Sequence, residues 1–388
     1  MSNRRSAIKL AVILAVAIAL PAFVQADSDA TSTTFDIQLP LGIPREVWAY
    51  YVPKTNPITA AKVELGRKLF FDPKLSADGT VSCATCHDPA RAFTDGKQTA
   101  EGIAGRRGKR NSPTLLNAMF NASQFWDGRA SSLEEQAKMP LVNPDEMGNA
   151  SYDQVVSRLS AIPEYTKLFR DVFDASPNID SVAKAIAAFE RTLVSGNAPI
   201  DRYLAGDVNA LSESARNGLI LFRSKARCGV CHNFNQAFAT FATFPFFTDM
   251  NYRNTGVAAR TNGFGVLTKR ALQTSKDESG SMLTALSRHE EAPALGRFLI
   301  TGNTLDIGAF RTPSLRNVEL TAPYFHDGSA ATLQDVVKFY VKGGIENPAR
   351  DWQLEPVDLT ESEQSDLVEF LKALTSDDAR RAIESRTR

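Results

Sequence analysis

Two short stretches of the chain carry two cysteines and a histidine at the same spacing. Each reads Cys-x-x-Cys-His, which puts two thiols one helical turn apart with a histidine directly after them. Such thiols can add to the two vinyl groups of a porphyrin, and the histidine can then supply a ring nitrogen to the iron, as in a c-type haem. The residues are Cys83, Cys86 and His87 in the first copy and Cys228, Cys231 and His232 in the second.

The rest of the sequence bears on the other uses of this spacing. A single motif could also be half of a zinc site or a thiol–disulfide motif. The chain has four cysteines, and the two motifs use all of them. A shared zinc site with four cysteines would leave both His87 and His232 unexplained, and the βαβ pattern of a thioredoxin-like fold is missing. We therefore predict two covalent c-type haems and no disulfide bond.

The elements that must hold these motifs are predicted to be helices. Apolar residues recur at helical spacing from Thr59 to Phe71, before the first motif, and from Leu211 to Phe222, before the second. Further helical stripes lie between Val155 and Leu193. Thr360 and Glu363 form a capping box before a last helix. No run of alternating strands is present, so we predict a mainly α fold.

The two halves of the chain repeat each other. Downstream of the haem motifs, seven residues recur at a constant offset of 200 positions, namely Pro113, Leu115, Asn117, Phe125, Asp127, Gly128 and Leu133. Upstream, a Gly-x-x-Leu-Phe sequence begins at Gly66 and again at Gly218. The haem cysteines are offset by only 145, so the second half carries some 55 extra residues near Asn233 to Ile300. We expect this insertion to form an exposed elaboration of a duplicated, cytochrome-c-like domain.

These patterns predict the organisation of the chain. Residues 1–26 read as a signal peptide, with a basic start and an apolar stretch that is short for a membrane span. Residues 27–57 are a polar lead-in with little periodicity. We expect a first haem domain over residues 58–205 and a second over residues 206–388.

The net charge of the chain and its expected export limit which molecules it can bind. The chain has 44 basic and 44 acidic residues, and cleavage after Ala26 would remove three basic residues and no acidic one. The mature net charge of about −3 argues against nucleic acid or an anionic membrane as a partner. We expect a periplasmic protein without a membrane span.

The sequence resembles the bacterial di-haem cytochrome c peroxidase family, including its MauG-like members, over nearly the whole mature chain. The resemblance rests on several specific stretches besides the haem motifs. They are Leu65-Gly-Arg67, Asp72-Pro73, Arg110-Asn111, Phe125-Trp-Asp-Gly-Arg129, Gln136-Ala137, Glu146-Met147 and Thr321-Ala-Pro-Tyr-Phe-His326.

The resemblance implies a peroxidatic haem in the first half and an electron-transfer haem in the second. Gln136 and Glu146 match the pair in the distal pocket of the peroxidatic haem, and Trp126 matches a tryptophan between the haems. A carboxylate near the iron can move the proton of a bound peroxide to its far oxygen, so that water leaves. Read without the family, Glu146 would be taken for a solvated acid at a helix start. A core aromatic is the alternative reading of Trp126.

The family also has a calcium ion between its domains. The positions that match its site are Asn111 and the backbone carbonyls of Thr321 and Pro323. A side-chain amide and carbonyl oxygens are suitable ligands for this hard cation.

Two positions depart from the peroxidases of the family. Their loop after the first motif carries a histidine that blocks the resting peroxidatic iron, and here its place falls at Ile103. We therefore predict a haem that is open on its distal side. The methionine ligand of the second haem is replaced by Tyr340, as in MauG-like members. A phenolate stabilises ferric iron, so we expect a low potential there. A plain core aromatic is the alternative reading of Tyr340.

Three functions remain open from the sequence. The first is a peroxidase that reduces hydrogen peroxide at the His87 haem with electrons from a small redox protein, while the His232/Tyr340 haem stores or transfers oxidising equivalents. The second is MauG-like oxidation of a protein or other substrate through a high-valent di-haem state. The third is a non-enzymatic electron carrier. A homodimer is compatible with each of them.

Overall fold

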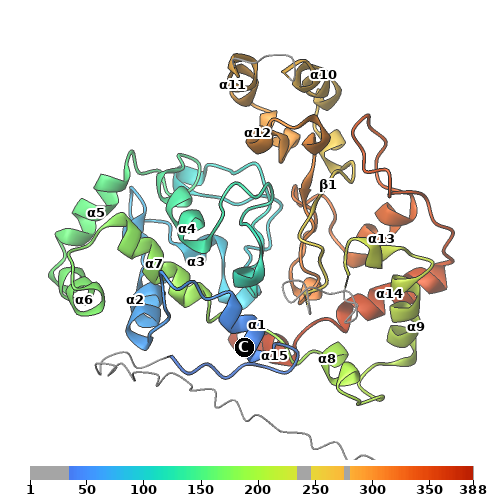
Figure 1. Ribbon diagram of the computed structural model, residues 1–388, viewed down its shortest axis with the longest axis horizontal. Helices are drawn as coiled ribbons and strands as arrows, with labels where there is room; N and C mark the ends of the chain where they lie inside the picture. Colours follow the sequence, from blue (N-terminus) through green and yellow to red (C-terminus); the bar gives the residue numbers. More distant parts are fainter. Residues whose placement is uncertain (1–34, 234–245, 275–279, 388) are drawn as a thin grey trace, which may run out of the picture. The chain divides into compact units, whose positions relative to one another are not determined.

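The computed structural model describes residues 35–233, 246–274 and 280–387 (Figure 1). The expected signal peptide and the Phe-rich start of the insertion lie outside these residues. The α-helices are α1 (Arg45–Tyr50), α2 (Ala60–Phe71), α3 (Cys83–Cys86), α4 (Leu133–Val142), α5 (Tyr152–Ser160), α6 (Pro163–Phe173), α7 (Ile179–Glu190), α8 (Pro199–Leu204), α9 (Glu213–Arg223), α10 (Phe264–Thr274), α11 (Ser281–Ser287), α12 (Phe298–Thr301), α13 (Leu333–Val341), α14 (Glu361–Lys372) and α15 (Asp377–Thr387).

Strands are few among the described residues. β1 (Tyr252–Arg253) pairs with β2 (Phe310–Arg311) as an antiparallel ladder of two residues each. The prediction of a mainly α fold is therefore confirmed. No helix within the described ranges is long and apolar enough to cross a bilayer.

The same helix pairing occurs in both halves. α2 packs against α7, and α9 packs against α14. A Cβ atom at Gly66 would overlap the backbone oxygen of Ala185, and one at Gly218 would overlap that of Asp366. The repeated glycine thus lets two helix backbones approach closely at each crossing. This contact explains why the Gly-x-x-Leu-Phe sequence occurs twice.

A substitution at the first crossing should be costly. Gly66→Ala should lower the free energy of unfolding by about 1–3 kcal/mol, because the added methyl group must separate α2 from α7. Guanidinium denaturation followed by circular dichroism measures the change. Gly265→Ala on α10 is the matched control, since a Cβ there meets nothing within 4 Å. That control should be neutral or stabilising by up to about 1 kcal/mol, and equal effects of the two substitutions would contradict this account of the crossing.

The segments at an offset of 200 also adopt matching local structures. Asn117 and Asn317 both have left-handed backbones, with φ of 63° and 59°. Each precedes a single 3-10 turn, at Ala118–Phe120 and Val318–Leu320. The halves then meet through two equivalent backbone hydrogen bonds. The Asn111 N–H donates to the His326 oxygen at 2.9 Å, and the Arg311 N–H donates to the Trp126 oxygen at 2.8 Å.

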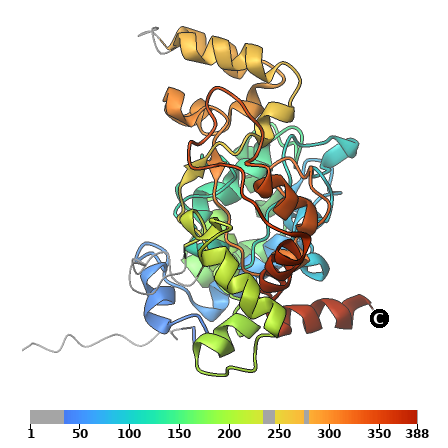
Figure 2. The same ribbon diagram turned by 90° about the vertical axis from the view of Figure 1, so that its right-hand side faces the viewer.

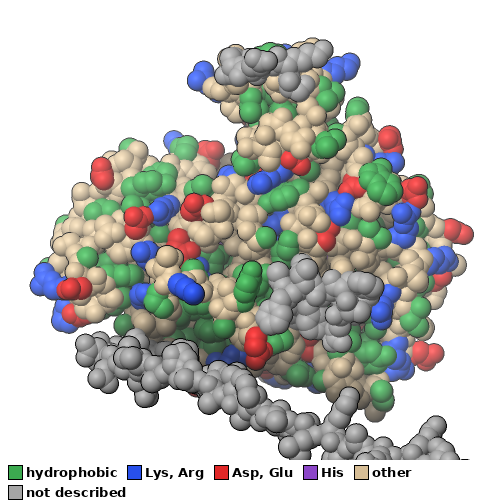
Figure 3. Space-filling view, viewed as in Figure 1, with side chains coloured by type: hydrophobic (Ala, Val, Ile, Leu, Met, Phe, Trp, Pro, Cys, Tyr) green, Lys and Arg blue, Asp and Glu red, His purple; other side chains and the backbone are tan. Residues whose placement is uncertain are grey.

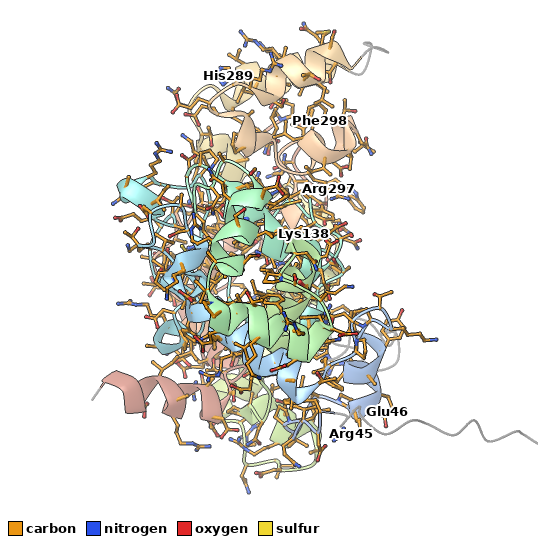
Figure 4. All side chains as sticks on the ribbon, turned by 90° about the vertical axis from the view of Figure 1, so that its left-hand side faces the viewer. Arg45, Glu46, Lys138, His289, Arg297 and Phe298 are labelled. Carbon is orange, nitrogen blue, oxygen red and sulfur yellow. The ribbon has the colours of Figure 1, made fainter. Side chains whose placement is uncertain are left out.

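Part of the insertion forms a small cluster of helices, which we call the cap and which consists of α10, α11 and α12 with their connecting turns. These helices lie next to one another in both views (Figures 1 and 2). Their buried side chains, which include Leu267, Leu286 and Phe298, form a hydrophobic cluster of their own. Figure 4 labels Arg297 next to Phe298, at the lower edge of the cap. Arg297 joins the cap to the first half by donating to the backbone oxygens of Asp127 at 3.0 Å and Gly128 at 2.8 Å.

The lead-in contains a helix that the sequence pattern did not indicate. α1 has only one turn and a half, which is too short for periodicity to be visible. Val47 and Trp48 are its buried residues, and the Trp48 indole N–H donates to the Arg191 oxygen at 3.3 Å. Tertiary contact therefore stabilises this helix, rather than its own sequence.

Candidate haem sites

The first motif forms one turn of helix, α3. Ser82 caps it, and the Ser82 N–H donates to Thr85 Oγ1 at 3.0 Å in a capping box. The His87 N–H donates to the Cys83 oxygen at 2.9 Å, so both thiols and the histidine are held by one short element. His87 Nδ1 lies 3.1 Å from the Phe93 oxygen. Because a carbonyl oxygen only accepts, Nδ1 carries the proton and Nε2 remains as the basic nitrogen for a metal.

The second motif reaches the same arrangement through a 3-10 turn, Cys228–Val230. The His232 N–H donates to the Cys228 oxygen at 2.9 Å, and His232 Nδ1 lies 2.8 Å from the Phe247 oxygen. Burial lowers the pKa of both His87 and His232. Both imidazoles are therefore neutral near pH 7, the form that binds a metal.

The two carbonyls that orient the histidines were not identified from the sequence, although a signal is present. Phe93 and Phe247 each begin a Phe-Thr-Asp sequence, repeated 154 positions apart. The backbone before each phenylalanine is held in a matching way. Thr114 Oγ1 donates to the Ala92 oxygen at 2.5 Å, and Ser314 Oγ donates to the Phe246 oxygen at 2.6 Å. A search for further repeats after the haem motifs would have found them.

The second motif opens into a largely apolar cavity. Cys228, Cys231 and His232 line it, and Tyr340 of α13 also belongs to its lining. Burial is the main cause that raises the pKa of Tyr340, so its phenol stays neutral here unless a cation faces it. An apolar cavity with two thiols and one free imidazole nitrogen on its wall fits a porphyrin attached at this motif.

The thiols themselves are unlike those of redox-active sites. Burial raises the pKa of Cys83 and Cys86 to about 12, of Cys228 to about 12 and of Cys231 to about 11. Reactive thiols of thiol–disulfide motifs have lowered pKa values instead. The part of the chain that the structure describes also holds no group of three or more His, Cys, Asp or Glu side chains placed to share a metal ion. The pKa values disfavour the thiol–disulfide reading, and the separation of the side chains disfavours a shared zinc site.

Glu146 lies beside the first motif, in the turn that follows α4. Its carboxylate interacts electrostatically with both Cys83 and Cys86, and Glu146 Oε1 accepts a hydrogen bond from Asn143 Nδ2 at 2.8 Å. Burial raises the pKa of Glu146, while Arg129 and the Asn143 hydrogen bond act in the opposite direction. The position 200 residues later, Glu346, is exposed instead and pairs with Arg350. Only the first half therefore has a carboxylate in this turn that is partly shielded from solvent.

The other residues of the expected distal pocket lie on α4 and on the loop after the first motif. Gln136 is half-buried on α4. The Ile103 N–H donates to the Glu146 oxygen at 2.9 Å, and the Ile103 side chain packs against the hydrophobic core of the first half. The loop is thus attached to the turn that carries Glu146 and places the aliphatic side chain of Ile103 next to it.

Trp126 lies in the lining of the cavity of the second motif, together with His326. The Trp126 indole N–H donates to the Asn111 oxygen at 2.9 Å. His326 stacks on Phe310 with ring centroids 3.5 Å apart, and burial lowers its pKa to about 3. His326 is therefore a neutral, packed residue at the contact between the halves.

The three positions of the expected calcium site all belong to the lining of this large cavity, namely Asn111, Thr321 and Pro323. The Asn111 side-chain amide donates to the Lys97 oxygen at 2.9 Å, so its Oδ1 atom is the one that remains for a cation.

The helical fold and the two equivalently held histidines, each directly after a pair of thiols, are the features expected of a protein that carries two haems. A family model described as di-haem cytochrome c peroxidase matches residues 60–209. The methylamine utilization protein MauG of Methylorubrum extorquens is 40% identical over 84% of this chain and 82% of its own length. The cytochrome c551 peroxidase of Nitrosomonas europaea is 37% identical over 84% of this chain and 83% of its own. The chain belongs to the di-haem cytochrome c peroxidase family and is an oxidoreductase with two haems.

Solved structures agree with this assignment. A MauG-like protein associated with microbial copper homeostasis has a TM-score of 0.71 at 32% identity, covering 89% of this chain and 97% of that one. The di-haem peroxidase BthA of Burkholderia thailandensis has a TM-score of 0.62 at 24% identity, covering 83% and 87%, and shows the shared fold.

Proposed function

We propose that this protein reduces hydrogen peroxide at a haem attached to Cys83 and Cys86, with His87 as the ligand to iron. A second haem, attached to Cys228 and Cys231, stores or transfers the oxidising equivalents. The observation that carries this assignment is the asymmetry at Glu146, which is partly buried beside the first motif while Glu346 is exposed. A reaction that moves protons needs an ionisable group next to the iron, and electron transfer alone does not.

The side chains of the first site have separate tasks. A bound haem supplies the iron at which the oxygen–oxygen bond of the peroxide is cleaved. Glu146 would be the base that takes one proton of the peroxide and returns it to the oxygen that leaves as water. Gln136 would hold the peroxide by a hydrogen bond, and Trp126 would carry electrons between the two sites. Two electrons and two protons from outside complete the reduction to two molecules of water.

The remaining expectations complete the proposal. The two halves are duplicated cytochrome-c-like domains, residues 58–205 and 206–388, and a calcium ion between them is held by Asn111 with the carbonyls of Thr321 and Pro323. The protein is exported to the periplasm, where a small redox protein supplies the electrons. The face in Figure 3 mixes acidic and basic side chains without a large patch of one sign, so recognition of this donor would depend on a local surface.

Two measurements test the proposal. Electron paramagnetic resonance of the ferric protein should show one high-spin haem, because Ile103 leaves the distal side of the first iron without a histidine. Stopped-flow mixing with hydrogen peroxide should then change the absorption of this haem rapidly. Two low-spin signals with no rapid reaction would instead identify an electron carrier.

Two residues favour MauG-like oxidation as a second candidate. Ile103 removes the need for reductive unmasking, and Tyr340 should give the second haem a low potential, unsuited to a high-potential cytochrome donor. Rapid turnover with reduced cytochrome c would exclude this candidate. A near-infrared band after mixing with peroxide, without such turnover, would support it over the peroxidase.

Tyr340 is proposed as the distal ligand of the second haem, and replacing it should change that haem alone. Tyr340→Met should raise its reduction potential by on the order of 100 mV, because a thioether favours ferrous iron where a phenolate favours ferric. Spectroelectrochemistry measures the shift. Tyr324→Phe is the matched control, since Tyr324 lines the same cavity and should leave the potential nearly unchanged. An unchanged spectrum and potential in Tyr340→Met would show that Tyr340 is not a ligand.

A further inference from the structure

Glu190, the last residue of α7, is a buried carboxylate that the proposed mechanism does not use. It is 4% exposed, and its Oε2 atom has no hydrogen-bond partner among the described residues. A buried, unpaired carboxylate costs several kcal/mol, so it is seldom kept without a reason. Its electrostatic interaction with Cys83 places it near the first haem motif.

The duplicated architecture shows which wall Glu190 occupies. Gly66 packs against Ala185 and Phe189 of α7, and Gly218 packs against Asp366 and Phe370 of α14. These contacts align the two helices in one register, in which the residue after Phe189 corresponds to the residue after Phe370. Glu190 therefore corresponds to Leu371.

Leu371 shows what this position faces. It lines the cavity that also contains Cys228, Cys231 and His232. The second half thus places an apolar side chain against its haem site, and the first half places a carboxylate there. Unlike leucine, a glutamate at this position can gain or lose a proton, so the charge beside the first haem motif can change.

The charged neighbours of Glu190 do not neutralise it. Arg191, which follows Glu190 in the chain, forms two hydrogen bonds with Glu134 of α4, at 2.7 and 2.9 Å. Lys62 of α2 and Lys184 of α7 lie around that pair rather than around Glu190. Burial raises the pKa of Glu190 to about 8. The positive charge of Arg191 lowers this pKa, and the negative charge of Glu134 raises it. Without a charged iron nearby, the carboxyl group therefore holds a proton near neutral pH.

We propose that Glu190 is a redox-linked proton site of the first haem. Reduction of the iron adds one electron from the donor, and the Glu190 carboxylate takes up one proton from solvent. Oxidation of the iron releases that proton again, and no other bond forms or breaks. The cause is the charge of the iron, because a ferric centre stabilises a nearby carboxylate more than a ferrous centre does. This inference rests on the proposed haem at Cys83 and Cys86.

The direction in which the reduction potential changes with pH follows from the pKa of Glu190 beside ferric and beside ferrous iron. The carboxyl group has a lower pKa beside ferric iron than beside ferrous iron, so between those values reduction is accompanied by proton uptake. The reduction potential of the first haem should then fall as the pH rises. The limiting slope is about 59 mV per pH unit, since a tenfold change in equilibrium constant corresponds to 59 mV for one electron.

The experiment is a redox titration of the high-spin haem by spectroelectrochemistry between pH 6 and pH 10, on the full protein with both haems. The wild-type potential should decrease with pH, while Glu190→Gln and Glu190→Leu should remove most of the slope. Glu190→Leu carries the residue of the second half, so the helix crossing should tolerate it. Glu64→Gln, an exposed carboxylate of α2, is the control and should keep the full slope.

A second readout does not depend on any variant folding. Reduced-minus-oxidised infrared difference spectra of the wild-type protein should contain a carboxyl band that appears on reduction. The proposal would be overturned if the wild-type reduction potential did not change with pH and no such band appeared. It would also be overturned if Glu146→Gln abolished the pH dependence of the potential while Glu190→Gln preserved it. Absence of a high-spin haem or of a reaction with peroxide would instead contradict the proposed function, so the two failures can be told apart.

Discussion

Glu146→Gln should slow the reaction of the ferric protein with hydrogen peroxide by about 10²-fold or more. Glutamine keeps the size of the side chain and its hydrogen bond to Asn143, but it cannot accept the proton that the far oxygen of the peroxide needs before it can leave. Stopped-flow absorption of the high-spin haem measures the rate directly. The haem content and the resting spectrum should remain those of the wild type.

The duplicated chain supplies the control for this substitution. Glu346→Gln changes the residue at the same place in the second half, where the carboxylate is exposed and pairs with Arg350. Its rate should equal that of the wild type. A normal rate in Glu146→Gln would remove Glu146 from the mechanism, and a comparable loss in both variants would point to a general effect on the fold.

The pH dependence of the same rate provides a related test. The proton relay needs Glu146 as a carboxylate, and burial raises the pKa of this residue above its usual range. The rate should therefore fall on acidification at a higher pH than an exposed glutamate would give. Arg129 opposes the effect of burial, so Arg129→Gln should move the fall to still higher pH.

Much of the fold could be predicted because local patterns determine it. The helix expected from Thr59 to Phe71 forms as α2, with the Thr59 side chain accepting a hydrogen bond as its cap. The capping box at the start of α14 forms as well, and the Glu363 N–H donates to Thr360 Oγ1 at 3.2 Å. Caps and helical stripes lie within a few residues of one another, so one sequence is enough to see them.

The contacts around the candidate sites depend instead on residues far apart in the chain. Haem attachment could be expected from five consecutive residues, but the carbonyl partner of His232 is 15 positions away. Glu190 was described only by the helical stripe of its neighbours. Its place beside Cys83 results from the packing of α7 on α2, and a carboxylate at the end of an apolar stripe does not indicate which side it faces. The register with Leu371 became visible only from the helix crossings.

Arg316→Met should lower the free energy of unfolding by about 3–5 kcal/mol, because it leaves a buried carboxylate without its cation. Arg316 Nη1 and Nη2 donate to the two oxygens of Asp201 at 2.9 and 2.6 Å, and each side chain is 2% exposed. Asp201 also accepts a hydrogen bond from the Ala198 N–H at 2.9 Å, so the loss should reach the start of α8. Guanidinium denaturation measures the change.

The same arginine lies close to the second haem site, which allows a sharper test. Its guanidinium group is 5.9 Å from the centre of the Phe247 ring, and the Phe247 carbonyl orients His232. The loss of stability should therefore be accompanied by a change in the spectrum of the second haem, while the high-spin haem stays as it was. Lys167→Met removes an exposed ion pair with Asp171 and should cost less than about 1 kcal/mol. If both substitutions had the same small effect, the buried pair would not stabilise the packing of α8 against the second half. If Arg316→Met instead altered the high-spin haem, its influence would pass between the halves rather than through Phe247.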